Sequence, residues 1–276
     1  MTEISFEFFP PKTDKGREKL ESIRKKLAEF SPEYFSVTYG AGGSTRNNTK
    51  DIVLGIRGDG QDVAPHLSFG ADSKETIRDL LQIYNDNGIS RLVALRGDLP
   101  SGMGAIAPVY ASELVAFVRT EFGDAFEIAV ACYPEVHPQA SSFQADIDFL
   151  KRKLDAGADY AISQYFYNVE AFFYFMDACQ KAGIDKPIYP GVMPITNAES
   201  LIRFSDACGA DIPRWIRKAL ADRPDPAQIS AFGEEVVTEL CRQLLEFGVP
   251  GFHFYTMNQF EPSAQLCRNL GLSATD

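Results

Sequence analysis

The sequence predicts an α/β protein, a (β/α)8 TIM barrel with an extra helix before the last strand. Eight short apolar runs, rich in β-branched and aromatic residues, alternate with segments of helical periodicity at a spacing of roughly 30 residues. The runs begin near residues 4, 34, 63, 91, 127, 160, 187 and 251. A doubly wound open sheet is the alternative. No Gly-rich turn follows the first run, so the barrel is favoured.

The helical segments carry start signals as well as apolar stripes. The stripe over 77–84 is preceded by Asp72 with Glu75 three residues later, a capping-box spacing. Ser141 with Gln144 has the same spacing. These pairs predict where two of the helices begin.

The gap before the last run is about twice the usual length, which predicts an additional helix around 213–221. After the last run one short helix fits, around 262–270. No linker or low-complexity stretch divides the chain. We therefore expect residues 1–276 to form a single (β/α)8 barrel catalytic domain.

Charge and cysteine content exclude several classes of protein. A formal net charge of −11 and a pI near 4.8 oppose binding to nucleic acid or to an anionic membrane. The five cysteines include no C-x-x-C pair, so no zinc or redox motif is expected, and no metal site is predicted. No signal segment or membrane-spanning run occurs, which predicts a cytoplasmic protein. The oligomeric state stays open, with a homo-oligomer as one alternative.

Glu7 is the first candidate for catalysis. Alternation in the first run places Ile4, Phe6 and Phe8 on one face, which suits the helix layer, and leaves Glu7 facing into the barrel. Burial there would raise the pKa of the carboxyl group and make it a general acid. The alternative is a structural glutamate paired with an arginine.

Other polar side chains reach the carboxyl ends of the strands, where barrel enzymes have their active sites. By the same alternation Thr38, His66 and Arg96 point inward, and Gln164 lies near the end of the sixth run. The fifth run ends at Tyr133, before a segment that brings His137 to the same rim. His253, in the last run, is interpreted as a hydrogen-bonded barrel histidine. This convergence predicts an enzyme that acts on a small molecule.

These strand ends resemble those of the methylenetetrahydrofolate reductase family. The resemblance covers almost the whole chain in order, and its most specific segments are A-L-R-G-D-L-P at 94–100 and Y-P-E-V-H-P at 133–138. Further matching segments are S-F-E-F-F-P-P at 5–11, S-V-T-Y-G-A at 36–41, A-P-H-L at 64–67, Y-A-S at 110–112, Q-A-D at 144–146, K-R-K-L-D-A-G-A at 151–158 and F-H-F-Y-T-M-N at 252–258. The chain ends soon after the barrel, as in the short bacterial form that has no C-terminal regulatory domain.

The resemblance implies a role for individual residues. Glu7 falls on the proton donor of the family, and Asp98 on the carboxylate between flavin and folate. Gln164 matches an amide that contacts folate or nicotinamide in turn, and Phe204 a mobile aromatic that covers the substrate. The implied FAD contacts are Thr38, Tyr39, His66, Arg96, Gly97, Asp98, Tyr110, Ala111, Tyr133, His137, Ala140, Asp146, Arg152 and Lys153.

Two positions depart from the family pattern. Phe149 stands where the family commonly has an asparagine that contacts the flavin, so one polar contact at the adenosine end is missing. Gln259 stands at a substrate-binding position where an arginine is expected, so its charge is absent or supplied elsewhere.

The implied activity is the reduction of 5,10-methylenetetrahydrofolate to 5-methyltetrahydrofolate, a step of one-carbon metabolism that serves methionine biosynthesis. NADH or NADPH would reduce FAD, and folate would then take the same place and accept the hydride. Two other functions are weighed against this one: a flavin barrel of the proline-dehydrogenase type, and a flavin-free pterin-binding methyltransferase barrel.

Overall fold

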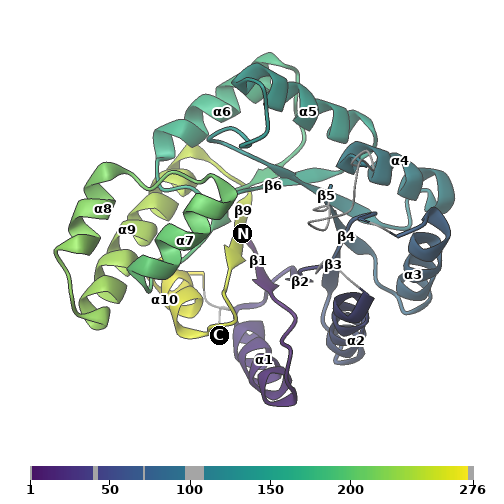
Figure 1. Ribbon diagram of the computed structural model, residues 1–276, viewed down its shortest axis with the longest axis horizontal. Helices are drawn as coiled ribbons and strands as arrows, with labels where there is room; N and C mark the ends of the chain where they lie inside the picture. Colours follow the sequence, from purple (N-terminus) through teal and green to yellow (C-terminus); the bar gives the residue numbers. More distant parts are fainter. Residues whose placement is uncertain (1, 40–42, 71, 97–108, 273–276) are drawn as a thin grey trace.

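In the computed structural model, which describes residues 2–39, 43–70, 72–96 and 109–272, parallel strands form a ring that is surrounded by helices (Figure 1). All strands of the described residues belong to one sheet, in the order β7-β6-β5-β4-β3-β2-β1-β9-β8. The strands are β1 Glu3–Phe8, β2 Tyr34–Val37, β3 Val63–Leu67, β4 Arg91–Ala94, β5 Glu127–Cys132, β6 Tyr160–Ser163, β7 Ile188–Tyr189, β8 Gly191–Val192 and β9 Gly251–Tyr255.

The seventh position of the barrel is a strand broken in two at Pro190. β7 pairs with β6, and β8 pairs with β9, so the two short strands bring the two edges of the sheet together. Proline has no N–H to donate, but its carbonyl oxygen accepts a hydrogen bond from the N–H of His253 at 3.0 Å. Nine strands therefore fill eight barrel positions, which confirms the predicted (β/α)8 fold.

The helices lie outside the ring and follow the predicted order. They are α1 Asp14–Leu27, the short 3-10 helix η1 Ala28–Phe30, α2 Gly43–Gly58, α3 Lys74–Asp86, α4 Ala111–Phe122, α5 Phe143–Asp155, α6 Val169–Lys181, α7 Ala198–Cys208, α8 Arg214–Ala221, α9 Pro226–Phe247 and α10 Glu261–Asn269. Helix α8 is the predicted extra helix before the last strand, and α10 is the predicted short helix after it.

Two helices begin one residue later than their sequence signals indicated. The N-cap of α3 is Ser73, whose hydroxyl accepts from the N–H of Thr76, rather than Asp72. The N-cap of α5 is Ser142, which accepts from the N–H of Ala145, rather than Ser141. In both cases neighbouring residues have capping side chains, and the backbone path decides which of them adopts the extended cap conformation.

Two apolar clusters lie on opposite sides of the sheet. The outer cluster packs the strands against the helices and includes fully buried Phe6, Phe8 and Phe35 on the faces that alternation assigned to the helix layer. The inner cluster contains Tyr34, Ala64, Val93, Ala129, Tyr160 and Ile162, with Leu95 packed against it.

The inner cluster corrects one expectation. Val93 and Leu95 occupy the inner side of the fourth strand, so strand alternation does not point Arg96 into the barrel. Arg96 lies two residues beyond the end of β4 and is half-buried. Whether the side chain of Arg96 approaches the carboxyl ends of the strands therefore depends on the path of the chain after β4.

All five cysteines are unpaired thiols. Within the part of the chain that the structure describes, no helix is long and apolar enough to cross a membrane.

Candidate active site

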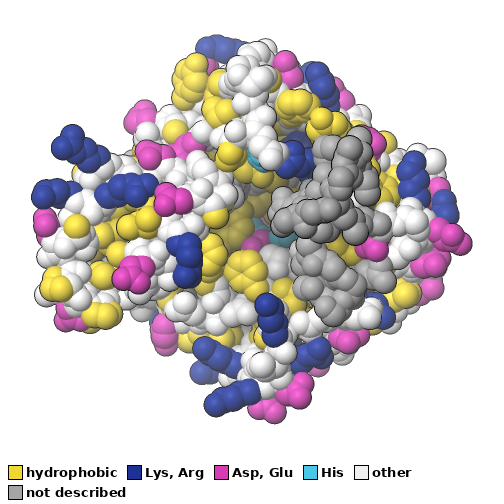
Figure 2. All heavy atoms as spheres, in the orientation of Figure 1, with side chains coloured by type: hydrophobic (Ala, Val, Ile, Leu, Met, Phe, Trp, Pro, Cys, Tyr) yellow, Lys and Arg dark blue, Asp and Glu magenta, His cyan; other side chains and the backbone are white. Residues whose placement is uncertain are grey.

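A carboxyl group and two imidazoles meet inside the barrel. Oε2 of Glu7 lies 3.3 Å from Nε2 of His66 and 3.4 Å from Nε2 of His253. The three side chains come from β1, β3 and β9, and each is buried. Figure 2 shows acidic and histidine side chains deep in a hollow near the centre of the face, beside hydrophobic side chains.

The position of Glu7 is fixed through its backbone as well as through its side chain. Its carbonyl oxygen accepts a hydrogen bond from Oγ1 of Thr256 at 2.6 Å, at the point where β9 ends. Strand pairing places Glu7 beside Ser36 of β2 and Tyr255 of β9. The inward orientation that strand alternation predicted for Glu7 is therefore confirmed.

The expected rise in the pKa of Glu7 is wrong. Burial does raise the pKa, but the charge of His66, the hydrogen bond from His253 and the remaining interactions with the two imidazoles outweigh it, and the pKa is lowered to about 2. The partners are histidines rather than the arginine of the structural alternative. The carboxyl group is therefore ionised near neutral pH, with both imidazoles directed at its Oε2 atom.

The two imidazoles are held differently. Nδ1 of His253 lies 2.7 Å from the hydroxyl oxygen of Ser5, and its Nε2 makes the hydrogen bond to Glu7. Nε2 of His66 is buried and forms no hydrogen bond with any described residue, although it lies within ion-pair distance of Glu7. His253 is thus the hydrogen-bonded barrel histidine that the sequence predicted, and His66 keeps a buried polar atom that a ligand could satisfy.

The segments after β2 and β5 carry several of the predicted flavin contacts. Thr38 follows β2 directly and its N–H donates to the carbonyl oxygen of Phe8 at 3.0 Å, while the hydroxyl of Tyr39 donates to Asp72 at 2.9 Å. After β5, the rings of Tyr133 and His137 meet edge to face with centroids 4.5 Å apart.

The turn after β5 is tied to the first turn of α5. Asp146 accepts a hydrogen bond from the N–H of His137 at 2.8 Å, and the N–H of Ala140 donates to the carbonyl oxygen of His137 at the same distance. Burial and the charge of Asp146 raise the pKa of Tyr133 to about 12, while the charge of Arg96 lowers it. Arg96 therefore does reach the neighbourhood of Tyr133, from beyond the end of β4.

Helix α5 contributes two cations. Nζ of Lys153 donates to the carbonyl oxygen of Ala131 at 2.5 Å, and burial lowers the pKa of its ammonium group. The guanidinium group of Arg152 lies 5.0 Å from the ring centre of Phe149. Together with Arg96, these groups form local positive charge on a chain whose net charge is −11.

This donor set fits FAD. Its pyrophosphate is a dianion that needs nearby cations, and Arg152, Lys153 and Arg96 could supply them. The unsatisfied Nε2 of His66 offers one more hydrogen-bonding group.

Phe149 stands where the family pattern has an asparagine, and its ring forms a stacked pair with that of Tyr110. Its ring lies 6.0 Å from that of Tyr110, with 17° between the ring planes, and both side chains are exposed. Tyr110 is the N-cap of α4, and Ala111 is the first residue of that helix. An aromatic surface at this position can contact a planar base by stacking instead of by hydrogen bonding.

The predicted substrate residues lie on three different elements. Gln164 follows β6, and its side-chain oxygen accepts from the N–H of Tyr165 at 3.0 Å. Phe204 lies on α7 and is 37% exposed. Gln259 is exposed in the segment after β9. Gly97 and Asp98 lie outside the described residues.

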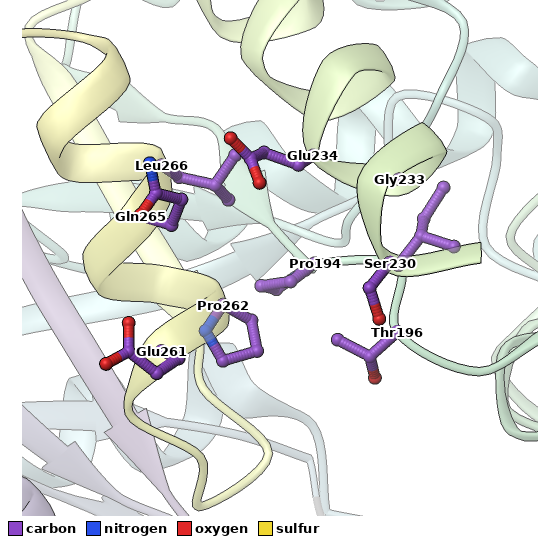
Figure 3. A pocket seen from close by; sticks show the side chains of 10 residues that line it. Pro194, Thr196, Ser230, Gly233, Glu234, Glu261, Pro262, Gln265 and Leu266 are labelled. Atoms are coloured by element: carbon purple, nitrogen blue, oxygen red, sulfur yellow. The ribbon is translucent and has the colours of Figure 1, made fainter. Parts of the chain in front are cut away.

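A separate pocket of about 280 Å³ lies between α9, α10 and the segment after β8 (Figure 3). Its two carboxylates already have partners, because Glu234 accepts from Asn269 at 2.8 Å and Glu261 from Arg268 at 3.2 Å. None of the predicted site residues line it. It is not the centre of the predicted chemistry.

Glu135 is a residue of this region that the sequence analysis did not single out. Its carboxylate accepts from the N–H of Asp211 at 2.7 Å, which ties the segment after β5 to the segment after α7. Burial raises the pKa of this carboxyl group to about 7. The feature of the sequence that could have identified Glu135 was its position within the segment 133–138, between Tyr133 and His137.

Comparison with known proteins agrees with the motifs. The methylenetetrahydrofolate reductase family profile matches residues 1–271. The chain is 41% identical over 271 residues to the 5,10-methylenetetrahydrofolate reductase of Escherichia coli K12, covering 98% of this chain and 90% of that protein. It is 37% identical to methylenetetrahydrofolate reductase (NADH) 1 of Arabidopsis thaliana, where it covers 48% of that longer protein.

Among solved structures, the barrel is similar to a protein from Clostridium thermocellum described as binding two copies of 5-methyl-5,6,7,8-tetrahydrofolic acid. The TM-score is 0.69 at 16% identity, and the match covers 97% of this chain and 94% of that one. At this identity the similarity supports the barrel fold, and the sequence relatives carry the functional argument.

Proposed function

Because the chain belongs to the methylenetetrahydrofolate reductase family, it is an oxidoreductase, and we propose that it reduces 5,10-methylenetetrahydrofolate to 5-methyltetrahydrofolate. NADH or NADPH is the proposed electron donor, and FAD the proposed carrier of the hydride. The nicotinamide donor and the folate acceptor would use one face of the flavin in turn, in a ping-pong reaction. The proposed enzyme is the single barrel, residues 1–276.

The observation that carries this proposal is the buried cluster of Glu7, His66 and His253 at the carboxyl side of β1. Reduction of the folate requires a proton as well as a hydride, and the cluster places a carboxyl group at the carboxyl side of β1, where a proton could be delivered. A charged side chain deep in a barrel is costly to bury unless it is paired, and the carboxylate of Glu7 is paired with two imidazoles.

The chain's own residues supply the proton chemistry. The chemistry that FAD would supply when bound is hydride transfer between the nicotinamide and the folate carbon. That carbon is held in a five-membered ring, which must open before it accepts a hydride. Glu7 delivers the proton to N10 of the folate, and the C–N10 bond then breaks with its electron pair going to N10.

The remaining residues bind and orient the reactants. Asp98 is proposed to hydrogen-bond the pterin edge and to place a negative charge beside the flavin. Gln164 would contact folate and nicotinamide in turn, Phe204 would cover them, and Gln259 would lie at the rim of the substrate site. The flavin would be held from the strand ends, with its pyrophosphate beside Arg152 and Lys153.

The flavin can be tested with the purified protein. We expect absorbance near ~450 nm that is lost when NADH is added without oxygen and returns when methylenetetrahydrofolate is added. Proline, offered in place of NADH, should leave the spectrum unchanged. A colourless protein that takes up no added FAD would contradict the flavin proposal. The unpaired cysteines also support a reducing compartment, and we propose the cytoplasm as its location.

A further inference from the structure

His253 is a buried titratable group that the proposed reaction has not yet used. It is 1% exposed, and its Nε2 forms the hydrogen bond to Glu7. The two residues are 246 positions apart in the chain and meet because β1 and β9 are neighbouring strands. A histidine with no purpose beyond packing would not need its nitrogen directed at a buried carboxylate.

Ser5 fixes the direction in which the imidazole of His253 points. Strand pairing places Ser5 directly beside His253, and the hydroxyl oxygen lies 2.7 Å from Nδ1. A hydroxyl group both donates and accepts, so this contact suits both protonation states of the ring. In the cation Nδ1–H donates to the hydroxyl of Ser5 and Nε2–H faces Glu7. Once the Nε2 proton has passed to Glu7, the neutral ring keeps its hydrogen on Nδ1, which still donates to Ser5, and the bare Nε2 accepts from the carboxyl group.

The surroundings of the ring leave Glu7 as its main charged neighbour. The ring of Tyr34 lies 6.3 Å away and that of Tyr255 5.3 Å away, centre to centre, and the hydroxyl of Ser36 lies 3.5 Å from Nε2. His66 approaches the same carboxylate oxygen from β3.

We propose that His253 is a positioning residue that stores the proton which Glu7 delivers to the folate. The N–H bond of the imidazolium breaks at Nε2, whose electron pair stays on nitrogen, and an O–H bond forms on Glu7. That O–H bond then breaks as the proton passes to N10, and water restores the proton of His253. The inference rests on the proposed function, since it needs a substrate that requires a proton.

This role of His253 explains how Glu7 can deliver a proton although its own pKa is low. A carboxyl group with a pKa of about 2 is ionised at neutral pH and cannot act as a general acid by itself. With a protonated imidazole in contact, the carboxylate obtains its proton at the moment of transfer. The charge of His66 and the hydrogen bond from His253 together lower the pKa of Glu7, and that hydrogen bond also gives the proton a direct path from Nε2 to the carboxylate.

The test follows each half-reaction by stopped flow, as a function of pH. His253→Gln keeps an N–H donor beside Glu7 but cannot carry a transferable proton. We expect flavin reduction by NADH to stay within about two-fold, and reoxidation by methylenetetrahydrofolate to fall ten-fold or more, part of the ~10²–10⁴-fold effect of a general acid. The alkaline loss of rate in the folate step should disappear in this variant.

Two further variants complete the experiment. The double variant Glu7→Gln/His253→Gln should be no slower than Glu7→Gln alone, because the two residues act in one path. Ser5→Ala should weaken the folate step, whereas Ser263→Ala, another fully buried serine, should not. Equal slowing of both half-reactions by His253→Gln, or additive effects in the double variant, would overturn the proposal. If the unmodified protein does not reoxidise with folate at all, the proposed function fails instead.

Discussion

The polar groups at the two ends of the barrel are paired differently. At the amino ends of the strands, Arg91 pairs with Glu127 at 2.7 Å and its guanidinium group lies 5.1 Å from the ring centre of Tyr34. The hydroxyl of Tyr189 donates to Glu3 at 2.5 Å. These groups come from five strands, β1, β2, β4, β5 and β7, and their charges are paired within the described residues, although the hydroxyl of Tyr160 at the start of β6 has no hydrogen bond there.

Toward the carboxyl ends, charges meet but are not fully satisfied. Glu7 has two imidazoles on one oxygen, and Nε2 of His66 lacks a hydrogen bond to the described part of the chain. The guanidinium group of Arg152 lies over the ring of Phe149 and has no ion pair with an acidic side chain of the described residues. The difference indicates that the amino end stabilises the fold and the carboxyl end is arranged for chemistry, the usual division in this architecture.

The largest expected effect comes from Glu7→Gln. The amide keeps the size of the side chain and removes the group that delivers the proton, so folate-driven reoxidation should fall by ~10²-fold or more. Flavin reduction by NADH needs no such proton and should survive. Stopped-flow measurement of both steps checks this, with the exposed Glu239→Gln as control. Equal slowing of the two steps would make Glu7 a structural residue.

A substitution at the amino ends of the strands should lower the free energy of unfolding and leave the rates of both half-reactions unchanged. Arg91→Met removes the ion pair with Glu127 and the contact with Tyr34, and should lower the free energy of unfolding by about 1–2 kcal/mol. Lys181→Met, which breaks an exposed pair with Asp177 within α6, should leave the free energy of unfolding nearly unchanged, because solvent screens the pair. Urea denaturation measures both. Loss of folate reduction in a stably folded Arg91→Met protein would end the proposed division between the two ends.

The smallest expected effect concerns Glu135, which lies in the segment after β5. Its carboxylate joins this segment to the one after α7. Its pKa is raised to about 7 in the folded protein, so its stabilising contribution is complete below the unfolded value of 4.5 and is lost as the pH rises through 7. Glu135→Gln keeps an acceptor for the N–H of Asp211 and should flatten this part of the stability profile. The change should stay below about 1 kcal/mol, because the carboxyl group is partly exposed and solvent screens it.

Unfolding free energies at pH 5 and pH 8, compared between the unmodified protein and Glu135→Gln, check the sign. Glu7 should behave in the opposite direction, since its pKa is lowered to about 2: its contribution is present above 4.5 and is lost only as the pH falls toward 2. An identical pH slope in the Glu135→Gln protein would show that this carboxyl group does not titrate near neutrality.

The sequence by itself determined the order of strands and helices, the extra helix α8 and the inward direction of Glu7. These follow from local periodicity, because side chains alternate along a strand and recur every three to four residues along a helix. The candidate residues Tyr133 and His137 were found in the same way, since they directly follow a strand.

The tertiary structure decided what depends on contacts between distant segments. The break of the seventh strand at Pro190 depends on pairing with two different neighbours, and the helix caps Ser73 and Ser142 on the path of the preceding backbone. The pKa of Glu7 was expected to rise and is lowered, because His66 and His253 arrive from β3 and β9. Periodicity predicts which way a side chain points. Only the closed ring determines which groups the side chain contacts there, and hence the direction in which its pKa is shifted.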